Sequence, residues 1–556
     1  MFRKPPHPSR FLAALLIAFA PCSLRAADPP GDPPEREVPA DDVLESRGAV
    51  IGEIHIQTRD IFEPGEGYHF FQIANHLHRT TRAGVIRSQL LFKEGDRYDR
   101  RVLDESERAL RDKRYLYDAE IRPVAVHGDR VDLEVVTKDV WTTNLGVGLG
   151  RSGGANSTRF MIQDTNLLGT GKGLTLERVS DVDRTTSLLR YDDQAVLGSH
   201  VRLGVAYSSN SDGSERWLDL NRPFFSLDTH WSSGLTVSSE DRVDTLYALG
   251  HATDRFRHQQ DLFEIRGGLS HGLVDGWSRR WSTGFTFLRD RFEPALATDG
   301  QAGTAAGFPL PGDRTLAFPW IAYDRVEDRF LETHNMNQIQ RTEDLQLGGQ
   351  THFRLGWSSP VFGGDRNVGV LDATGSLGFK PSEDQTVLLS SELSGRWGVD
   401  EPEGVRLGAS ARYFWRDFGE HLFFVTLQGD LVDNPDPETQ LLLGGDNGLR
   451  GYPLRYQDGD RRALLTLEQR FFTDLYPFKL FHVGGAVFFD AGRTWGQGND
   501  PASLNYGLLK DVGLGLRLSS SRSGLGNVVH IDLAFPLDGD GSIRNMQWLV
   551  STKAGF

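Results

Sequence analysis

From residue 140 to the C-terminus, apolar and polar side chains alternate with a period of two, and clusters of Asp, Gly and Asn separate the alternating runs. In residues 511–518, for example, Val512, Leu514 and Leu516 share one face, whereas Asp511 and Arg517 lie on the other. Successive side chains of a strand point to opposite faces, so each run predicts a β-strand with one apolar and one polar face. We count roughly twenty such runs, and no convincing helical pattern, before the chain ends.

Strands with one apolar and one polar face are what a transmembrane β-barrel requires, because lipid lies outside it and water inside. The mean hydropathy of −0.39 agrees with this, since such a wall needs only every second side chain to be apolar. A soluble β-sandwich would instead have short strands and an apolar interior. Aromatic side chains recur near the ends of the predicted strands, as in the interfacial girdles of membrane barrels: Phe471, Trp495, Tyr506 and Trp548. The fold class that we predict is therefore mainly β, a transmembrane antiparallel barrel over residues 140–556.

The N-terminal residues predict export. Residues 1–27 have the form of a signal peptide, with Arg3 and Lys4 before a short apolar run and small residues at its end. Residues 28–47 are rich in proline and charge, which predicts a disordered linker. Cys22 is the one cysteine and lies in the signal segment, so the mature chain would hold neither disulfides nor thiolate metal ligands. The net charge of −15 argues against a nucleic-acid partner, which requires a basic face.

Residues 48–139 have the pattern of a small α/β domain. Ile54 and Ile56 alternate with polar neighbours as a strand, and residues 85–92 fit a short helix. A second helix is expected to begin after Asp99, a suitable N-cap residue. Two strands, at residues 118–126 and 131–137, complete the domain, and an added helix around residues 70–78 is left open.

A long loop at residues 432–460 separates two candidate strands, and its composition predicts that it folds back on itself. Residues 444–448, with the sequence GGDNG, free the backbone from strand geometry and are followed by Arg450 between small or apolar neighbours. Such a segment can fold back and direct a guanidinium into a narrow space. Arginine suits that place, because its rigid fork of donors can hold a carboxylate through two hydrogen bonds.

The motif Leu449-Arg450-Gly451-Tyr452 resembles the V/L-R-G-F/Y motif of the BamA/TamA-type outer-membrane protein superfamily. Residues 485–492, with the sequence GAVFFDAG, resemble the family's Gly–aromatic–Asp–x–Gly strand, and the chain ends on Phe556 as the family's last strand does. The order strand, helix, helix, strand, strand, with Gly-Asp-x-Tyr-Asp at residues 95–99, resembles a POTRA domain. The resemblance implies one POTRA domain followed by a surface-antigen barrel of about 16 strands, fewer than the alternating runs. The chain is also similar to the barrel part of patatin-like autotransporters, without a patatin domain in the sequence ahead of residue 48.

The resemblance implies that the loop enters the barrel and that its arginine contacts carboxylates of the wall. If Phe489 faces lipid, Asp490 faces the lumen, where Arg450 could reach it. The hypothesis is a loop latch made of Arg450, Gly451, Tyr452 and Asp490. Three inward-facing neighbours could share this network: Asp511, Arg517 and Asp532. In the alternative, Asp490 is a solvated lumen residue and Arg450 belongs to an extracellular turn.

We expect the barrel to close between its first strand, near residues 143–150, and its last, at residues 545–556. Gly146, Gly148 and Gly150 thin the contacts of the first strand, so this seam should be the easiest to open. On the last strand, Trp548 and Phe556 belong to one outward ladder. We expect that ladder to be the insertion signal read by the barrel assembly machinery.

Sequence features that could indicate catalysis are weak. Residues 268–272 and 150–154 both match Gly-x-Ser-x-Gly, but a nucleophile elbow needs a strand that turns sharply into a helix, and neither site predicts one. Four carboxylates at the start of the loop could bind calcium but lack the spacing of a known calcium loop: Asp430, Asp433, Asp436 and Glu438. We therefore expect no enzyme activity, no cofactor and no metal.

The sequence favours a transporter or insertase in the outer membrane of a Gram-negative bacterium, with the POTRA domain in the periplasm. That domain would receive an unfolded, β-rich client at a strand edge, and the barrel seam would pass or insert it. Two alternatives stay open: a passive diffusion porin, and transfer of lipid or lipopolysaccharide across the outer membrane. The sequence does not distinguish secretion from insertion and leaves the client, the exact strand number and the oligomeric state open.

Overall fold

The computed structural model describes residues 38–62, 71, 75, 78–297, 303–398, 401–416, 421–496, 507–523, 528–539, 541, 543–553, and 555. The predicted signal peptide, the linker up to residue 37, most of the possible helix at residues 70–78, Tyr506 and Phe556 lie outside these residues.

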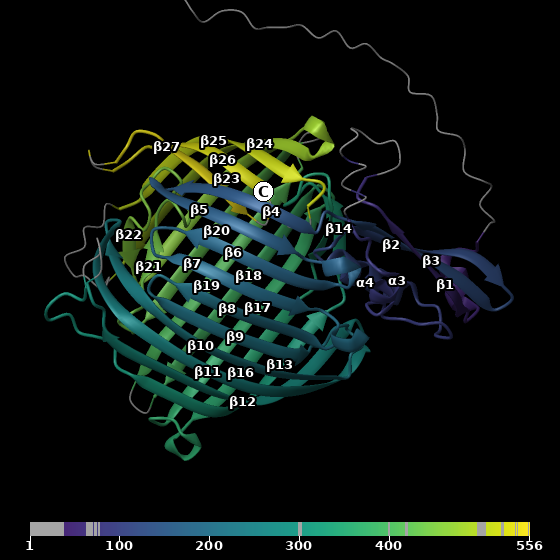
Figure 1. Cartoon of the computed structure of the whole chain (residues 1–556), viewed down its shortest axis with the longest axis horizontal. Helices are drawn as coiled ribbons and strands as arrows, with labels where there is room; N and C mark the ends of the chain where they lie inside the picture. The colour runs from purple at the N-terminus through teal and green to yellow at the C-terminus, as the bar shows by residue number, and fades with distance from the viewer. Residues whose placement is uncertain are drawn as a thin grey trace, which may run out of the picture.

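Twenty strands close one barrel, in which each strand is antiparallel to its neighbours (Figure 1). The first ten are β4 (Thr143–Ser152), β5 (Ala155–Asp164), β6 (Lys172–Ser180), β7 (Thr185–Asp193), β8 (Arg202–Asn210), β9 (Gly213–Arg222), β10 (Trp231–Ala248), β11 (His251–Val274), β12 (Trp277–Pro294) and β13 (Arg314–Glu327). The others are β16 (Gln350–Ser358), β17 (Val368–Ser382), β18 (Gln385–Trp397), β19 (Pro402–Trp415), β20 (His421–Asp433), β23 (Arg461–Phe472), β24 (Phe481–Trp495), β25 (Leu509–Ser520), β26 (Val528–Pro536) and β27 (Gln547–Lys553). The number of about 16 implied by the family resemblance is therefore wrong, and the count of alternating runs was the better guide.

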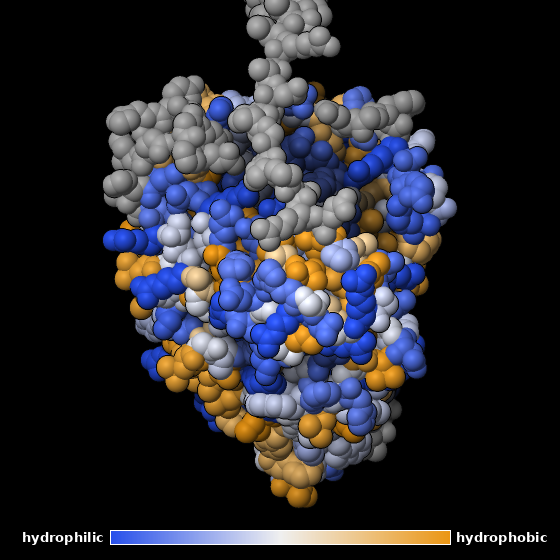
Figure 2. Space-filling model, turned by 90° about the vertical axis from the view of Figure 1, so that its right-hand side faces the viewer, coloured by the Kyte–Doolittle hydropathy of each residue, from blue (hydrophilic) through white to orange (hydrophobic). Residues whose placement is uncertain are grey.

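The two faces of the wall differ as the alternation predicts. On β25, Val512 and Leu514 are 37% and 54% exposed, whereas Asp511 and Arg517 are fully buried on the lumen side. Apolar side chains on the outside and charged ones inside suit a wall with lipid on one side and a polar interior on the other. Figure 2, which views the molecule from the side of the small domain, shows hydrophobic side chains gathered along the lower left flank. None of the helices formed by the described residues has the length and apolar character needed to cross a bilayer.

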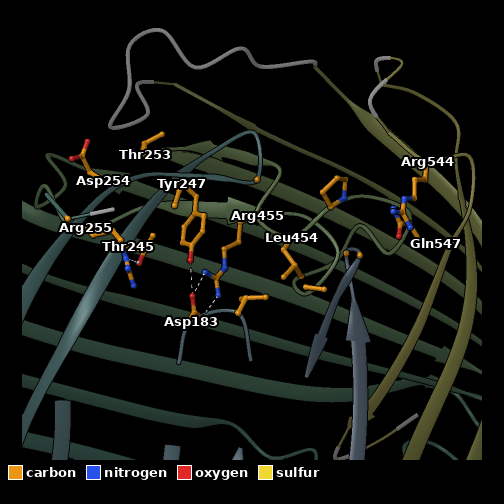
Figure 3. Close-up of a pocket in the computed structure, with 18 residues that line it drawn as sticks. Asp183, Thr245, Tyr247, Thr253, Asp254, Arg255, Leu454, Arg455, Arg544 and Gln547 are labelled. Carbon is orange, nitrogen blue, oxygen red and sulfur yellow. Dashed lines mark hydrogen bonds and ion pairs between the residues drawn. The ribbon is translucent and has the colours of Figure 1, made fainter. Parts of the chain in front are cut away.

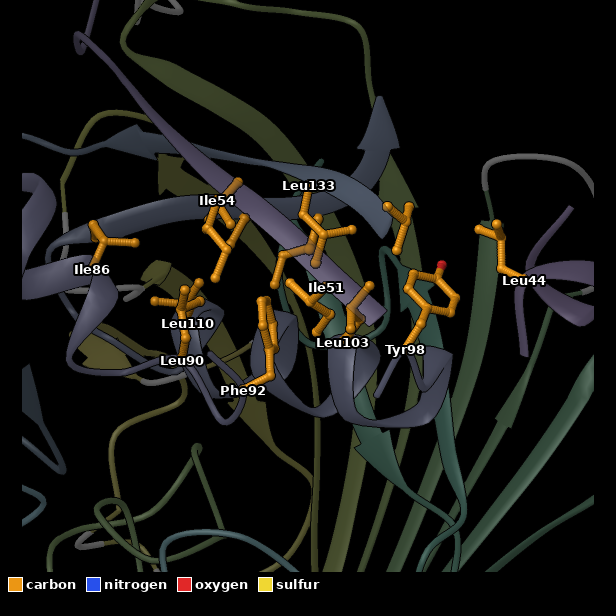
Figure 4. Close-up of a cluster of buried hydrophobic side chains, with 14 of the residues drawn as sticks. Leu44, Ile51, Ile54, Ile86, Leu90, Phe92, Tyr98, Leu103, Leu110 and Leu133 are labelled. Carbon is orange, nitrogen blue, oxygen red and sulfur yellow. The ribbon is translucent and has the colours of Figure 1, made fainter. Parts of the chain in front are cut away.

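The small domain has a three-stranded sheet in the order β1-β3-β2, with β1 (Val50–Arg59) parallel to β3 (Arg130–Asp139) and β2 (Leu116–His127) antiparallel to it. The helices α3 (Ala83–Arg87) and α4 (Arg100–Arg111) join the sheet around one apolar core (Figure 4). In that core, Ile51, Leu103, Leu110 and Leu133 are at most 1% exposed. The domain therefore has its own core and the predicted order of elements.

Three details of this domain differ from the sequence-based expectation. Residues of the predicted linker form helix α1 (Asp41–Ser46), because Leu44 is apolar and packs into the domain core with 1% of its surface exposed. Helix α3 is shorter than residues 85–92. Asp99 precedes α4 with extended backbone but its side chain makes no capping hydrogen bond.

Two short hairpins complete the fold. The hairpin of β14 (Phe330–His334) and β15 (Thr342–Gln346) connects β13 to β16 at the end of the barrel that faces the small domain, here called the domain end. The pair β21 (Leu441–Leu443) and β22 (Gln457–Gly459) belongs to the loop between β20 and β23, at the opposite or far end. In Figure 1 the label β14 lies beside β2, whereas β21 and β22 lie on the other side of the barrel.

Candidate functional site

The loop between β20 and β23 folds back into the lumen, and its glycine-rich centre makes this possible. Asn447 accepts a hydrogen bond from the backbone N–H of Gly444 at 2.6 Å, and Gly448 has a φ of 134°, which favours glycine. Gly451 passes close to β25, where a Cβ built on it would lie 2.7 Å from the Cβ of Asp511. The backbone can approach the wall this closely because residue 451 has no side chain.

Arg450 inserts into a buried, charged site on the barrel wall. Its Nε and Nη2 donate to the two carboxylate oxygens of Asp490 at 2.6 and 2.9 Å, and its Nη1 donates to Glu468 at 2.8 Å. The guanidinium carbon lies 3.4 Å from the ring centre of Phe488, and Thr466 donates a further hydrogen bond to Asp490. Asp490 is fully buried and Glu468 is 6% exposed, so lumen water does not replace these contacts. The guanidinium fork is thus used in full, as a lysine could not do.

Further charges surround this contact and nearly balance it. Arg470 donates to Glu468 at 3.0 Å, and Arg517 forms an ion pair with Asp532 on the next strand. Asp532 also lies 3.9 Å from Arg450, and Arg517 lies 3.9 Å from Glu468. Buried charges are tolerated when they are paired and hydrogen-bonded, so the cluster is stable as a unit and sensitive to the loss of one member.

The other residues of the predicted latch lie in the same place. Gly451 donates its backbone N–H to the carboxylate of Asp511 at 3.1 Å. The hydroxyl of Tyr452 donates to the carbonyl of Lys510 at 2.7 Å, and its ring is fully buried in an apolar cluster. That cluster is made of Leu443, Leu449, Tyr456, Leu464, Leu509 and Ile543. The loop is therefore held by apolar packing as well as by charge.

A second anchor, which the sequence analysis missed, holds the loop at the far end. Arg455 donates to both oxygens of Asp183 at 2.8 and 2.6 Å, and Tyr247 donates to the same carboxylate at 2.8 Å (Figure 3). This contact lowers the pKa of Asp183, chiefly through the hydrogen bonds from Arg455. The three residues line a cavity of about 670 Å³ that opens beside the seam.

Glu468 and Arg470 were also missed, although the sequence contains a signal for them. Leu464, Thr466, Glu468 and Arg470 share one face of β23, so alternation from the apolar face would have placed both charges in the lumen. Arg455 has no comparable signal, because it lies in the irregular loop.

Among the described residues, the seam between β4 and β27 is the shortest strand pairing in the barrel wall. Its ladder has one backbone pair, Val550 with Arg151, whereas β26 and β27 share seven. The guanidinium of Arg151 also lies 5.1 Å from the ring centre of Trp548. The predicted glycines of this strand face the lumen, between the exposed side chains of Leu145, Val147 and Leu149: Gly146, Gly148 and Gly150.

The acidic residues at the start of the loop engage arginines. Asp430 accepts two hydrogen bonds from Arg462 at 2.9 and 2.7 Å, and Asp436 accepts from Arg396 at 2.6 and 2.7 Å. Among the described residues, no group of three or more metal-binding side chains is arranged to hold an ion. Ser270, in one of the two Gly-x-Ser-x-Gly matches, lies within strand β11 and donates its hydroxyl to a backbone carbonyl.

No family model matches the chain, and no curated protein matches it. Solved structures that resemble it include BamA from Haemophilus ducreyi lacking POTRA domains 1–3, with 14% identity over 90% of this chain and 85% of that one, and a TM-score of 0.37. They also include CdiB from Escherichia coli, with 14% identity over 91% of this chain and 77% of that one, and a TM-score of 0.42. A third is the copper transporter OprC, with 9% identity over 92% of this chain and 81% of that one, and a TM-score of 0.38.

Proposed function

We propose that this protein is an outer-membrane transporter or insertase of the BamA/TamA type, which passes or inserts β-rich client polypeptides. The observation that carries the proposal is the contact of Arg450 with Asp490 and Glu468, since a loop from the far end is fixed to the lumen wall by buried charges. A static pore has no need of such a latch. A transporter does need one, because its lumen must stay closed until a client is present.

In this proposal the small domain acts as a periplasmic POTRA domain and offers a strand edge to the client. The edge of β2 is covered by its own helix: Glu107 accepts from the N–H of Ile121 at 2.7 Å, and Arg100 donates to the carbonyl of the same residue at 2.9 Å. A client that adds to β2 must displace these side chains. The start of β1 is already paired, because Ile51 donates to the carbonyl of Asp96 at 2.8 Å and accepts from the N–H of Gly95 at 2.9 Å. Beyond Ile51, a client would compete with Arg87, which donates to the carbonyl of Ile54 at 3.1 Å. We therefore favour the C-terminal half of β1 as the receiving edge.

The client would leave the barrel through the seam. In the part of the seam that the structure describes, opening the one pair between Val550 and Arg151 costs far fewer ladder hydrogen bonds than opening either neighbouring pair of strands. The strand edges exposed in this way are templates on which an incoming β-segment can pair. No nucleotide is required, because pairing and burial in lipid supply the free energy.

A disulfide across the seam tests this function. Arg151→Cys with Val550→Cys joins β4 to β27, and the control Ile531→Cys with Val550→Cys joins the same residue to β26, which faces it in the ladder. In cells, oxidation of the seam pair should cause client polypeptides, captured by a photo-crosslinker at Gln57 on β1, to accumulate. Equal capture in the two disulfide variants, or none at β1, would contradict the proposal.

A passive porin is the second candidate, and one observation favours it. A polar cavity of about 610 Å³ lies in the lumen along β13 to β23, lined by hydroxyl, amide and charged side chains that include Ser376, Ser390, Ser410, Gln428 and His352. A porin should conduct steadily whether the arginine loop is intact or disturbed. A latched transporter should conduct more when Arg450 is replaced. Lipid or lipopolysaccharide transfer would instead show as labelled lipid, not polypeptide, trapped at the locked seam.

A further inference from the structure

The β14–β15 hairpin crosses the domain end of the lumen. It is rooted between β13 and β16, but its tip lies against the wall formed by β19, β20 and β23. At the tip, Met336 and Ile339 are 2% and 1% exposed and pack against Phe414, Phe424 and Phe472. Asn337 reaches the chain beyond β27, since a Cβ built on Gly555 would lie 3.0 Å from the Cβ of Asn337. The hairpin therefore spans from one side of the opening to the seam side.

The barrel wall holds the tip through a charged side chain. Arg470, which is 2% exposed, donates to the carbonyl of Met336 at 2.7 Å. The same guanidinium donates to Glu468, which in turn accepts from Arg450 of the far-end loop. Two side chains of the wall, Arg470 and Glu468, thus lie between the hairpin at the domain end and the loop at the far end.

The small domain holds the hairpin from the other side. Arg111, near the end of α4, donates through Nε and Nη2 to both oxygens of Asp344 at 2.7 Å each, and to Glu332 at 3.2 Å. The hydroxyl of Tyr117 on β2 donates to the carbonyl of Gln340 at 2.9 Å. The Arg111 side chain is 9% exposed and that of Asp344 is 18% exposed, so this is a largely buried, bidentate ion pair.

Arg111 also connects the hairpin to the sheet edge of the small domain. Its Nη1 donates to the carbonyl of Ala119 on β2 at 3.2 Å. The guanidinium that holds Asp344 therefore also covers part of the free edge of β2.

We propose that the β14–β15 hairpin is a gate that closes the domain end of the lumen, held shut by Arg111 of the small domain and by Arg470 of the wall. The polar cavity along β13 to β23 begins at the root of this hairpin, where Val326 and Gln350 line it. Movement of the small domain releases Asp344, the tip leaves its aromatic seat, and the cavity becomes continuous with the solution at the domain end.

Conductance of the full-length protein in a planar bilayer tests the gate without any client. Asp344→Asn with Glu332→Gln removes two carboxylate partners of Arg111, and should give a several-fold rise in current. The matched control, Glu94→Gln with Glu134→Gln, also removes two negative charges, but from ion pairs within the small domain, with Arg87 and Arg122. The control should conduct like the unmodified protein.

A reversible lock distinguishes gating from damage to the fold. Asn337→Cys with Gly555→Cys places two Cβ atoms close to disulfide distance, in a mature chain that is expected to hold no other cysteine. Built into the Asp344→Asn, Glu332→Gln protein, this pair should return the current to the unmodified level when oxidised and raise it again when reduced. Heat-modifiable mobility on gels checks that each variant is folded.

The gate is overturned if the Asp344→Asn, Glu332→Gln protein conducts no more than its control, or if the disulfide leaves the raised current unchanged. Failure of client transport with normal gating would contradict the proposed function alone, since the current depends on no client.

Discussion

Arg450 reaches Asp490 from the far end of the barrel and binds both of its carboxylate oxygens, at 2.6 and 2.9 Å, where the two side chains are 9% and 0% exposed. Burial gives this pair its importance. An exposed ion pair contributes little to stability, but removal of one partner from a buried pair leaves the other charge without compensation.

Arg450→Ala and Asp490→Ala should each loosen the loop by about 3–5 kcal/mol, the usual cost of leaving a buried charge alone. The double variant should loosen the loop by less than the sum of the two single effects, because each single variant already loses the same Arg450–Asp490 contact. Protease access to residues 444–456 in folded protein measures this. Arg450→Lys should rescue poorly, since an ammonium group cannot reproduce the fork to Asp490 and Glu468. Additive effects of the two alanine variants would show that the pair does not hold the loop.

Gly451→Ala should release the loop without removing any charge. The added methyl group would lie 2.7 Å from the Cβ of Asp511 and 3.0 Å from the backbone nitrogen of Pro536, so either the loop or β25 must move. The same protease assay should show faster cleavage. Gly312→Ala is the matched control, because a Cβ there meets nothing within 4 Å, and it should behave as the unmodified protein does.

Lys113 should make the stability of the small domain depend on pH. Burial and the nearby Arg202 lower the pKa of this amino group to about 8. Between about pH 8 and 10.5 the unfolded chain binds more protons than the folded one, so stability should rise with pH through that window and be lowest below it. Lys113→Met should stabilise the domain at pH 7 by up to about 3 kcal/mol, and the gain should vanish at pH 11.

Urea-dependent protease access to residues 41–139 in the full-length protein measures the effect of Lys113→Met. A gain that is equal at pH 7 and pH 11 would show that the variant acts through packing and not through the charge.

Deletion of Phe556 should lower the amount of folded, heat-modifiable barrel in the outer membrane. The reason is the outward position of Trp548, which is 47% exposed on the last strand. Side chains of a strand alternate between its faces, so every second residue after Trp548 is expected to face outward as well. The signal would continue along that face to the terminal residue. Unchanged barrel levels would argue against an insertion signal at this end of the chain.

The wall of this barrel could be predicted from sequence because alternation is a local property. Val512 against Asp511, and Phe489 against Asp490, each fix a face without reference to any other strand. Alternation alone predicts that Asp490 faces the lumen. That Arg450 would be its partner was predicted from the resemblance of residues 449–452 to a family motif. The strand number implied by resemblance was wrong, because twenty strands pair in the closed barrel.

Contacts that depend on long connections could not be predicted. Arg455 meets Asp183 across 272 residues, and Arg111 meets Asp344 across 233, with no pattern in either neighbourhood that marks the partner. The β14–β15 hairpin was not identified from the sequence, because its place across the lumen depends on contacts with β19, β20 and β23 that are remote along the chain. Helix α1 was missed because charge and proline near it outweigh the single apolar residue, Leu44, that anchors it.

Glu343, at the base of the hairpin tip, accepts hydrogen bonds from the backbone N–H groups of Met336, Asn337 and Gln338 at 2.8 to 3.1 Å. The shape of the tip is thus encoded within the hairpin and does not depend on the wall against which it packs. A segment built in this way can leave its seat and return as a rigid body, with no local refolding to slow it. Its opening and closing should then be as fast as a hinge motion and fully reversible over many cycles.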